Sequence, residues 1–140
     1  DTDLEIEAIE QRSITAIFEH SGEAYFREKE LALCHTLTSL TRHIIATGGG
    51  FVLAKENQDL LRKLGPLVYL KTNFDTVLTR LENEQNRPLA KDPEQLDSLY
   101  IERHPQYETL ATYCISTDNL SIDEIASQIW NRYGDHTTTI

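Results

Sequence analysis

The stretch Ile44-Ile45-Ala46-Thr47-Gly48-Gly49-Gly50-Phe51-Val52 is the part of the sequence that decides the fold. Its apolar, β-branched start predicts a short buried strand. Three consecutive glycines suit neither a helix nor a strand interior, because glycine loses more backbone entropy on folding than any other residue. They suit a place where the backbone approaches a ligand, and open α/β sheets bind ligands where their strands end. The stretch therefore predicts a buried strand followed by either a ligand contact or a tight turn.

On both sides of this stretch, short apolar runs alternate with segments of helical periodicity. Such alternation predicts an α/β protein with a parallel sheet and helices on both faces. Gly22 and Pro105 should each interrupt a helix. Ser121 should cap the last helix, which should turn Ile125, Ile129 and Trp130 inward. The expected strands are residues 44–47, 67–70 and 114–116, and the expected helices are residues 14–18, 23–40, 55–64, 73–81, 94–103, 107–111 and 122–133.

Length, charge and cysteine content narrow the class of protein. The 140 residues predict one domain, which we place at residues 1–134, with a tail at 135–140. A net charge of −10 argues against a nucleic-acid partner, although a few local arginines could hold a small anion. No apolar run reaches the length of a membrane span, so no membrane partner is expected. Cys34 and Cys114 fit buried thiols of a reducing compartment, which indicates the cytoplasm.

Four groups of residues are of types that carry chemistry. The chain begins with Asp1-Thr2-Asp3, whose acids would also be favourable at a helix N-terminus without any catalytic role. Arg27 and Glu30 stand three apart on an expected helix, where an ordinary surface ion pair is the alternative interpretation. The triple glycine comes third. The fourth group is Arg87-Pro88-Leu89, in an expected surface loop at about residues 82–92, followed by Arg103 and Tyr107.

In this order and spacing, the four groups resemble shikimate kinase over nearly the whole chain. The resemblance implies a P-loop kinase fold and ATP-dependent phosphorylation of the 3-hydroxyl of shikimate, with Mg²⁺, so the expected partners are the small molecules shikimate and ATP. We expect a monomer, because the sequence shows no apolar stripe beyond the core faces. One feature departs from the family: the chain contains no Gly-x-x-x-x-Gly-Lys-[Ser/Thr] loop, which holds ATP phosphates. We therefore expect a fragment without its P-loop strand region, inactive alone. The alternatives are a non-catalytic shikimate-binding or regulatory module and a related small-molecule kinase such as a gluconate kinase.

The resemblance also implies roles on the substrate side. Asp3 would accept the proton of the attacking hydroxyl, and Asp1 would hold Mg²⁺ through water. Arg27 and Arg103 would bind the carboxylate of the substrate, and Glu30 would orient Arg27. Backbone contacts would come from Gly48, Gly49 and Gly50, and an apolar wall from Ile14, Phe18, Phe26, Pro88 and Leu89.

On the nucleotide side, the resemblance implies a lid at about residues 82–92. Arg87 in this lid would stabilise charge on the transferring phosphoryl group, while a solvated loop arginine is the simpler interpretation. Arg80 stands where the family has an arginine near adenine. Leu120 stands near the second adenine-side position, where a polar or basic side chain is usual in the family, so its role there is less clear.

Overall fold

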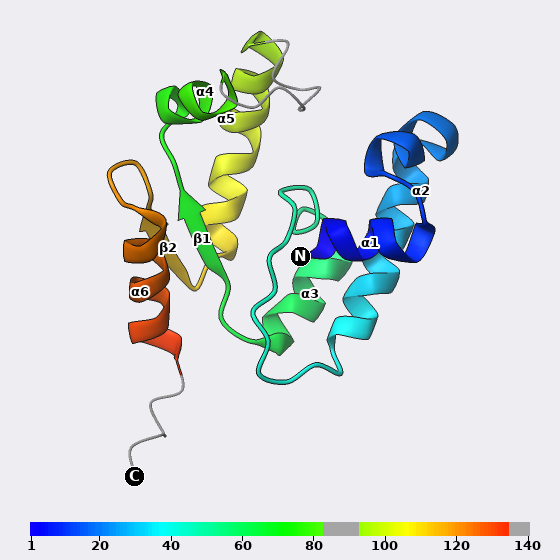
Figure 1. Cartoon of the computed structure of the whole chain (residues 1–140), viewed down its shortest axis with the longest axis horizontal. Helices are drawn as coiled ribbons and strands as arrows, with labels where there is room; N and C mark the ends of the chain where they lie inside the picture. Colours follow the sequence, from blue (N-terminus) through cyan, green and yellow to red (C-terminus); the bar gives the residue numbers. More distant parts are fainter. Residues whose placement is uncertain (83–92, 135–140) are drawn as a thin grey trace. The chain divides into compact units, whose positions relative to one another are not determined.

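A computed structural model of the chain describes residues 1–82 and 93–134. The chain forms two compact units, residues 1–65 and residues 66–140. The first unit contains the helices α1 (Thr2–Glu10), α2 (Ile14–Leu37) and α3 (Lys55–Leu64). Both α1 and α3 pack against α2 (Figure 1).

Short polar side chains begin the first two helices. The Asp1 carboxylate caps α1, because its Oδ1 accepts hydrogen bonds from the backbone N–H groups of Asp3 (2.9 Å) and Leu4 (3.2 Å). Ser13 caps α2 by accepting from the N–H of Ala16 at 3.2 Å. Ile6 on α1 is 1% exposed, whereas Leu4 and Ile9 on the same helix are 65% and 60% exposed.

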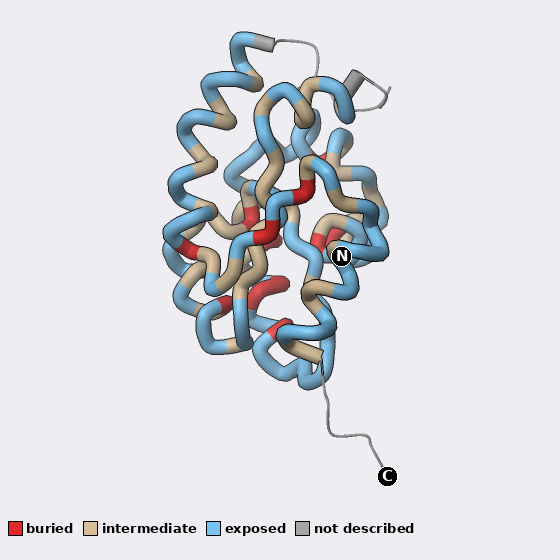
Figure 2. Tube along the Cα trace, turned by 90° about the vertical axis from the view of Figure 1, so that its left-hand side faces the viewer, coloured by how far each residue is buried: buried red, intermediate tan, exposed pale blue. Residues whose placement is uncertain are grey.

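Helix α2 has two segments. Gly22 has φ 81° and ψ 171°, which is not helical, so the break predicted at this residue is confirmed. The second segment ends at Leu37, three residues before the predicted Leu40. It buries Phe26, Leu33 and Cys34. Figure 2 shows the buried positions of the chain as short stretches of the trace.

The prediction of a strand at residues 44–47 is wrong for the described part of the chain. The sheet there has two strands, and neither is this stretch. Ile44 is 88% exposed, and the carbonyl of Ala46 accepts a hydrogen bond from the N–H of Thr2 at 2.9 Å instead of from a neighbouring strand. A strand needs a partner strand for its backbone groups, and this stretch has none among the described residues. The turn that follows is present, because the N–H of Phe51 bonds the carbonyl of Gly48 at 3.1 Å.

The second unit contains a parallel pair of strands with helical connections. Strand β1 (Val68–Lys71) pairs with β2 (Tyr113–Ser116), with Val68 opposite Tyr113. The connecting helices are α4 (Phe74–Glu82) and α5 (Pro93–Leu110), and α6 (Ile122–Tyr133) follows β2 (Figure 1). A parallel pair requires such a crossover, and the predicted α/β class with a parallel sheet is confirmed.

Three local expectations for the second unit have clear outcomes. Helix α5 continues through Pro105, so the predicted interruption is wrong. A proline inside a helix removes one backbone hydrogen bond, and the other bonds of the helix persist here. The prediction that Ser121 caps α6 is confirmed, because Ser121 and Glu124 form a complete capping box. Trp130 is 59% exposed, so the expectation that it faces inward is wrong.

The two cysteines also differ. Cys34 is buried, as predicted, whereas Cys114 is exposed.

Among the residues that the structure describes, no helix combines the length and the apolar character needed to cross a membrane.

Candidate functional site

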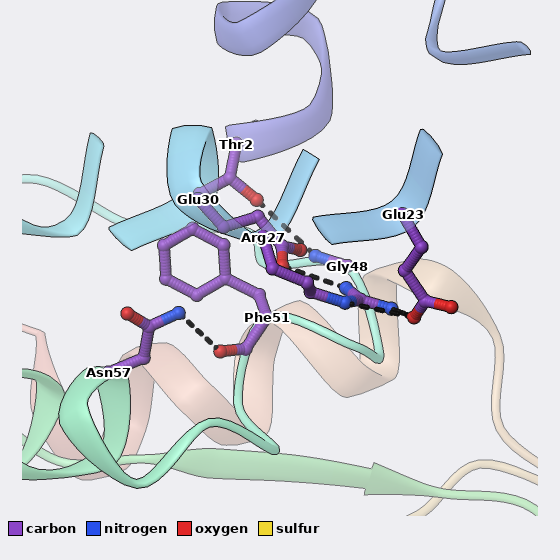
Figure 3. Close-up of polar contacts among 7 residues, drawn as sticks. All are labelled: Thr2, Glu23, Arg27, Glu30, Gly48, Phe51 and Asn57. Atoms are coloured by element: carbon purple, nitrogen blue, oxygen red, sulfur yellow. Dashed lines mark hydrogen bonds and ion pairs between the residues drawn. The ribbon is translucent and has the colours of Figure 1, made fainter. Parts of the chain in front are cut away.

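Arg27 lies between two carboxylates on the second segment of α2 (Figure 3). Its Nη1 donates to Glu30 Oε2 at 2.7 Å. On the other side, Nη2 and Nε both donate to Glu23 Oε1, at 2.8 and 3.2 Å. Because 23, 27 and 30 are spaced by four and three residues, a single helix brings all three side chains together. The predicted pairing of Arg27 with Glu30 is confirmed.

The two carboxylates differ in their exposure to solvent. The side chain of Glu30 is 2% exposed and that of Glu23 is 64% exposed. Burial raises the pKa of Glu30, although the hydrogen bond from Arg27 acts in the opposite direction. Burial also works against the charge of Arg27, but its bonds to Glu30 and Glu23 outweigh this and raise the pKa of the guanidinium. Arg27 is therefore a permanent cation with a well-defined position.

The glycine loop (residues 48–50) passes close to Asp3 and Arg27. A Cβ on Gly48 would lie 2.8 Å from Asp3 Oδ1. A Cβ on Gly50 would lie 2.9 Å from both Cζ and Nη2 of Arg27. With a side chain at either position, Asp3 or Arg27 would have to shift from its present place, and glycine avoids that shift. The site therefore brings together two charged groups and a backbone without side chains.

Three side chains hold the glycine loop and the residues that follow it, 51–53, in place. The hydroxyl of Thr2, a 2% exposed residue, accepts from the N–H of Gly48 at 3.3 Å. Asn57, in the first turn of α3, donates through Nδ2 to the carbonyl of Phe51 at 2.8 Å (Figure 3). The Phe51 side chain is fully buried. The neighbouring Gln58 donates to the carbonyls of Val52 and Leu53, at 3.0 and 3.3 Å.

The sequence analysis missed several of these residues. For Glu23 a signal was present, because a glutamate four residues before an arginine forms a favourable pair on a helix. Thr2, Phe51 and Asn57 gave no such signal, because their contacts with the loop join residues that are distant in the sequence or lie in irregular backbone.

The predicted apolar wall is partly described. The rings of Phe18 and Phe26 have centroids 5.0 Å apart. Phe26 is 4% exposed and Phe18 is 38% exposed, and the Cζ of Arg27 lies 5.6 Å from the centre of the Phe26 ring. Arg87, Pro88, Leu89 and the predicted lid at about residues 82–92 lie outside the described residues, apart from the end of α4.

A second polar cluster joins α1 to α2 around Glu10. Its carboxylate accepts hydrogen bonds from Lys29 Nζ (2.8 Å), Arg12 Nη2 (2.9 Å) and the Tyr25 hydroxyl (2.8 Å). These partners, Lys29 above all, lower the pKa of Glu10 to about 2. The cluster stabilises the packing of the helices that carry Asp3 and Arg27.

Asp1 lies at the N-terminus of α1, where one carboxylate oxygen is already used as the helix cap. No cluster of three or more metal-ligating side chains occurs in the described ranges 1–82 and 93–134. The binding of Mg²⁺ by Asp1 through water stays a prediction.

The remaining predicted residues lie in the second unit. Arg80 on α4 donates through Nη2 to the carbonyl of Thr117 at 2.9 Å and through Nη1 to its hydroxyl at 3.2 Å. Leu120 is half-buried between β2 and α6. Arg103 on α5 has a buried Nε without a hydrogen-bond partner among the described residues. Such a donor is available to an acceptor that the chain itself does not supply.

Parallel strands with helical crossovers define an α/β protein, and its first unit places an arginine beside a loop of glycines. The family model for shikimate kinase matches residues 1–133. The shikimate kinase of Cupriavidus pinatubonensis is 39% identical over 132 residues, which cover 92% of this chain and 69% of that protein. The shikimate kinase of Dictyoglomus turgidum is 39% identical over 140 residues, with coverage of 96% and 81%. The chain belongs to the shikimate kinase family.

Solved structures support the same assignment. Shikimate kinase from Acinetobacter baumannii in complex with shikimate matches with a TM-score of 0.86 and 34% identity, covering 94% of this chain and 75% of that one. Shikimate kinase from Aquifex aeolicus matches with a TM-score of 0.77 and 29% identity, covering 96% and 83%. The predictions of a shikimate kinase and of its P-loop kinase fold are therefore confirmed.

Proposed function

We propose that this chain carries the shikimate-binding side of an enzyme that transfers the γ-phosphoryl group of ATP to the 3-hydroxyl of shikimate. The observation that carries the proposal is the position of Arg27, which Glu23 and Glu30 hold beside Asp3 and the glycine loop. A solved shikimate kinase in complex with shikimate matches this chain with a TM-score of 0.86, and this similarity of fold supports the proposal.

The carboxylate of shikimate would bind Arg27. A guanidinium can donate two parallel hydrogen bonds to a carboxylate, and Arg27 is held in a fixed position. Arg103, whose Nε lacks a partner among the described residues, would supply a second cation. Backbone groups of Gly48, Gly49 and Gly50 would contact the ring, because the loop has no side chains to keep a ligand away.

Asp3 would act on the hydroxyl that attacks the phosphoryl group. Its carboxylate lies against Gly48, at the end of the loop that would contact the substrate. A carboxylate in this position can accept the hydroxyl proton as phosphoryl transfer proceeds. Phe18 and Phe26, with Pro88 and Leu89, would exclude water from one side of the ring.

ATP and Mg²⁺, when bound, supply the phosphoryl group and neutralise its charge. Asp1 suits Mg²⁺, which binds proteins through one or two carboxylates and several waters. Arg80, which Thr117 holds through two hydrogen bonds, would lie near adenine. Leu120 would stand at the second position near adenine. Arg87 would act on the phosphates. The P-loop sequence Gly-x-x-x-x-Gly-Lys-[Ser/Thr] does not occur in residues 1–140. The alternative candidate is a shikimate-binding module without kinase activity.

We further propose that the enzyme works in the cytoplasm as a monomer and binds neither nucleic acid nor a membrane. The net charge of −10 argues against a nucleic-acid partner. Its substrates would be small anions, which a few local arginines can attract although the chain as a whole is negative.

Calorimetric titration with shikimate tests the proposal. We expect binding by the wild type and much weaker binding by Arg27→Ala and Arg103→Ala, because each lost charge-assisted hydrogen bond costs about 1.5–3 kcal/mol. Arg62→Ala is the control, because Arg62 is an exposed arginine in the last turn of α3. Unchanged affinity in both site variants would disprove the paired arginines. Formation of shikimate 3-phosphate from ATP separates the kinase from the binding module.

A further inference from the structure

Glu23 makes a contact with Arg27 that differs in kind from the contact made by Glu30. A single oxygen of Glu23 accepts from both Nε and Nη2 of Arg27, so it occupies the long edge of the guanidinium. Glu30 accepts from Nη1 alone. Figure 3 shows the guanidinium between the two carboxylates. These contacts use three of the five N–H groups of Arg27.

The three engaged N–H groups determine which ones a ligand can use. Among the described residues, one N–H on Nη1 and one on Nη2 stay available. A carboxylate that binds both at once must meet them in one plane. The bond to Glu30 alone would allow the guanidinium to rotate about the Nη1 contact. The two bonds to Glu23 remove that rotation, because they hold Nε and Nη2 together.

The location of Glu23 suits this role. It is the first residue after the non-helical Gly22, at the start of the second segment of α2. Its side chain is 64% exposed, so its charge is screened by water and its contribution to stability is small. The main consequence of the contact is therefore the orientation of Arg27.

If Glu23 acted through its negative charge alone, it would weaken the binding of an acid instead of supporting it. Glu23 and Glu30 place two carboxylates against one arginine, and each carboxylate repels an anionic ligand. If Glu23 acted through its charge, or competed with the substrate for Arg27, its removal would strengthen binding of an acid. If Glu23 acts as a hydrogen-bond acceptor, an uncharged acceptor can replace it.

We propose that Glu23 is a positioning residue for the acid substrate: it fixes the plane of the Arg27 guanidinium so that the free N–H groups on Nη1 and Nη2 meet the carboxylate together. The inference rests on the proposed function, since the acid in question is shikimate. It assigns Glu23 no contact with the substrate and no part in the chemical step.

Glu23→Ala and Glu23→Gln test the inference by titration with shikimate and by steady-state kinetics. We expect Glu23→Ala to raise Kd and KM about three- to tenfold and to leave kcat unchanged, as expected when a binding group loses its orientation. Glu23→Gln keeps an oxygen acceptor at the same position, and it should bind shikimate within about twofold of the wild type. Glu28→Ala is the control, because it removes an equal charge from an exposed position on the same helix.

Two results would overturn the inference: affinity in Glu23→Ala that equals or exceeds that of the wild type, or affinity in Glu23→Gln as poor as in Glu23→Ala. The NMR signal of the Arg27 Nε–H provides a readout without ligand. Its exchange with solvent should be faster in Glu23→Ala than in the wild type and in Glu28→Ala. If the wild type shows this protected Nε–H and yet binds no shikimate, the proposed function fails and the substrate role of Glu23 fails with it. If shikimate binds and Glu23→Ala changes nothing, the inference alone fails.

Discussion

The backbone of Gly50 lies against the guanidinium of Arg27, so close that a Cβ at residue 50 would be 2.9 Å from both Cζ and Nη2. The two residues are far apart in the sequence, and the lack of a side chain at residue 50 leaves the space that the guanidinium occupies. The adjacent loop residue Gly48 has the same relationship with the carboxylate of Asp3. The glycine loop therefore leaves room for both charged groups, while Glu23 and Glu30 hold Arg27 in place.

Gly50→Ala should weaken shikimate binding. The added methyl group must displace the guanidinium or the loop, and either change breaks the alignment of Arg27 with its carboxylates. We expect a loss of about tenfold or more in affinity, comparable to the loss of one charge-assisted hydrogen bond. Calorimetric titration measures it.

Gly48→Ala provides the comparison for Gly50→Ala. Its methyl group would meet Asp3 rather than Arg27, so turnover should fall more than affinity. Equal effects of both variants on affinity, with no difference in turnover, would contradict separate roles for the two glycines.

Asp3→Asn should lower turnover far more than it lowers shikimate binding. The amide keeps the shape of the carboxylate but cannot accept the hydroxyl proton. General-base catalysis contributes about 10²–10⁴-fold, so kcat should fall within this range while KM changes little. Glu5→Gln, at an exposed acid in the same first turn of α1, is the control. Near-normal turnover in Asp3→Asn would leave Asp3 with a binding role only.

Glu10 should make the stability of the chain depend on acid pH. Its pKa in the folded chain is about 2, against an ordinary value of 4.5, chiefly because of Lys29 and Arg12. Ionised Glu10 therefore stabilises the folded chain above pH 4.5, and this contribution disappears as the pH falls toward 2. Glu10→Gln should have a lower denaturation midpoint at neutral pH and a weaker dependence on pH across this window.

Denaturant unfolding at a series of pH values between 2 and 7 measures the effect of Glu10→Gln. Glu19→Gln, at an exposed position on α2, is the matched control and should follow the wild type. A Glu10→Gln variant with the same pH dependence as the wild type would show that the cluster around Glu10 does not stabilise the fold.

Asn57→Ala should destabilise the chain by about 1–3 kcal/mol, because it leaves the carbonyl of Phe51 without its donor in a buried place. Asn57 is 1% exposed, and its Oδ1 has no partner among the described residues, so water cannot easily replace the lost bond. Chemical denaturation measures the loss. Gln58→Ala, which removes half-exposed bonds to Val52 and Leu53, should cost less. A larger loss of stability in Gln58→Ala than in Asn57→Ala would show that Gln58, and not Asn57, is the main anchor.

The sequence by itself determined the features that depend on neighbours along the chain. The bounds of α3 agree with the prediction at both ends, and the break at Gly22 and the cap at Ser121 follow from the backbone preferences and side-chain hydrogen bonds of single residues. The pair Arg27–Glu30 follows from helical spacing alone. The spacing of four residues between Glu23 and Arg27 likewise predicts an ion pair on one face of a helix.

Only the tertiary structure decided the features that need contacts across long stretches of chain. No local pattern shows that residues 44–47 lack a partner strand among the described residues, because pairing depends on which other strand is present. The exposure of Trp130 and Cys114 likewise depends on what packs beside them. The approach of Gly48 to Asp3 and of Gly50 to Arg27 joins residues that the sequence separates widely. Helical spacing identified the arginine, but the packing of the loop against α1 and α2 made it part of a site.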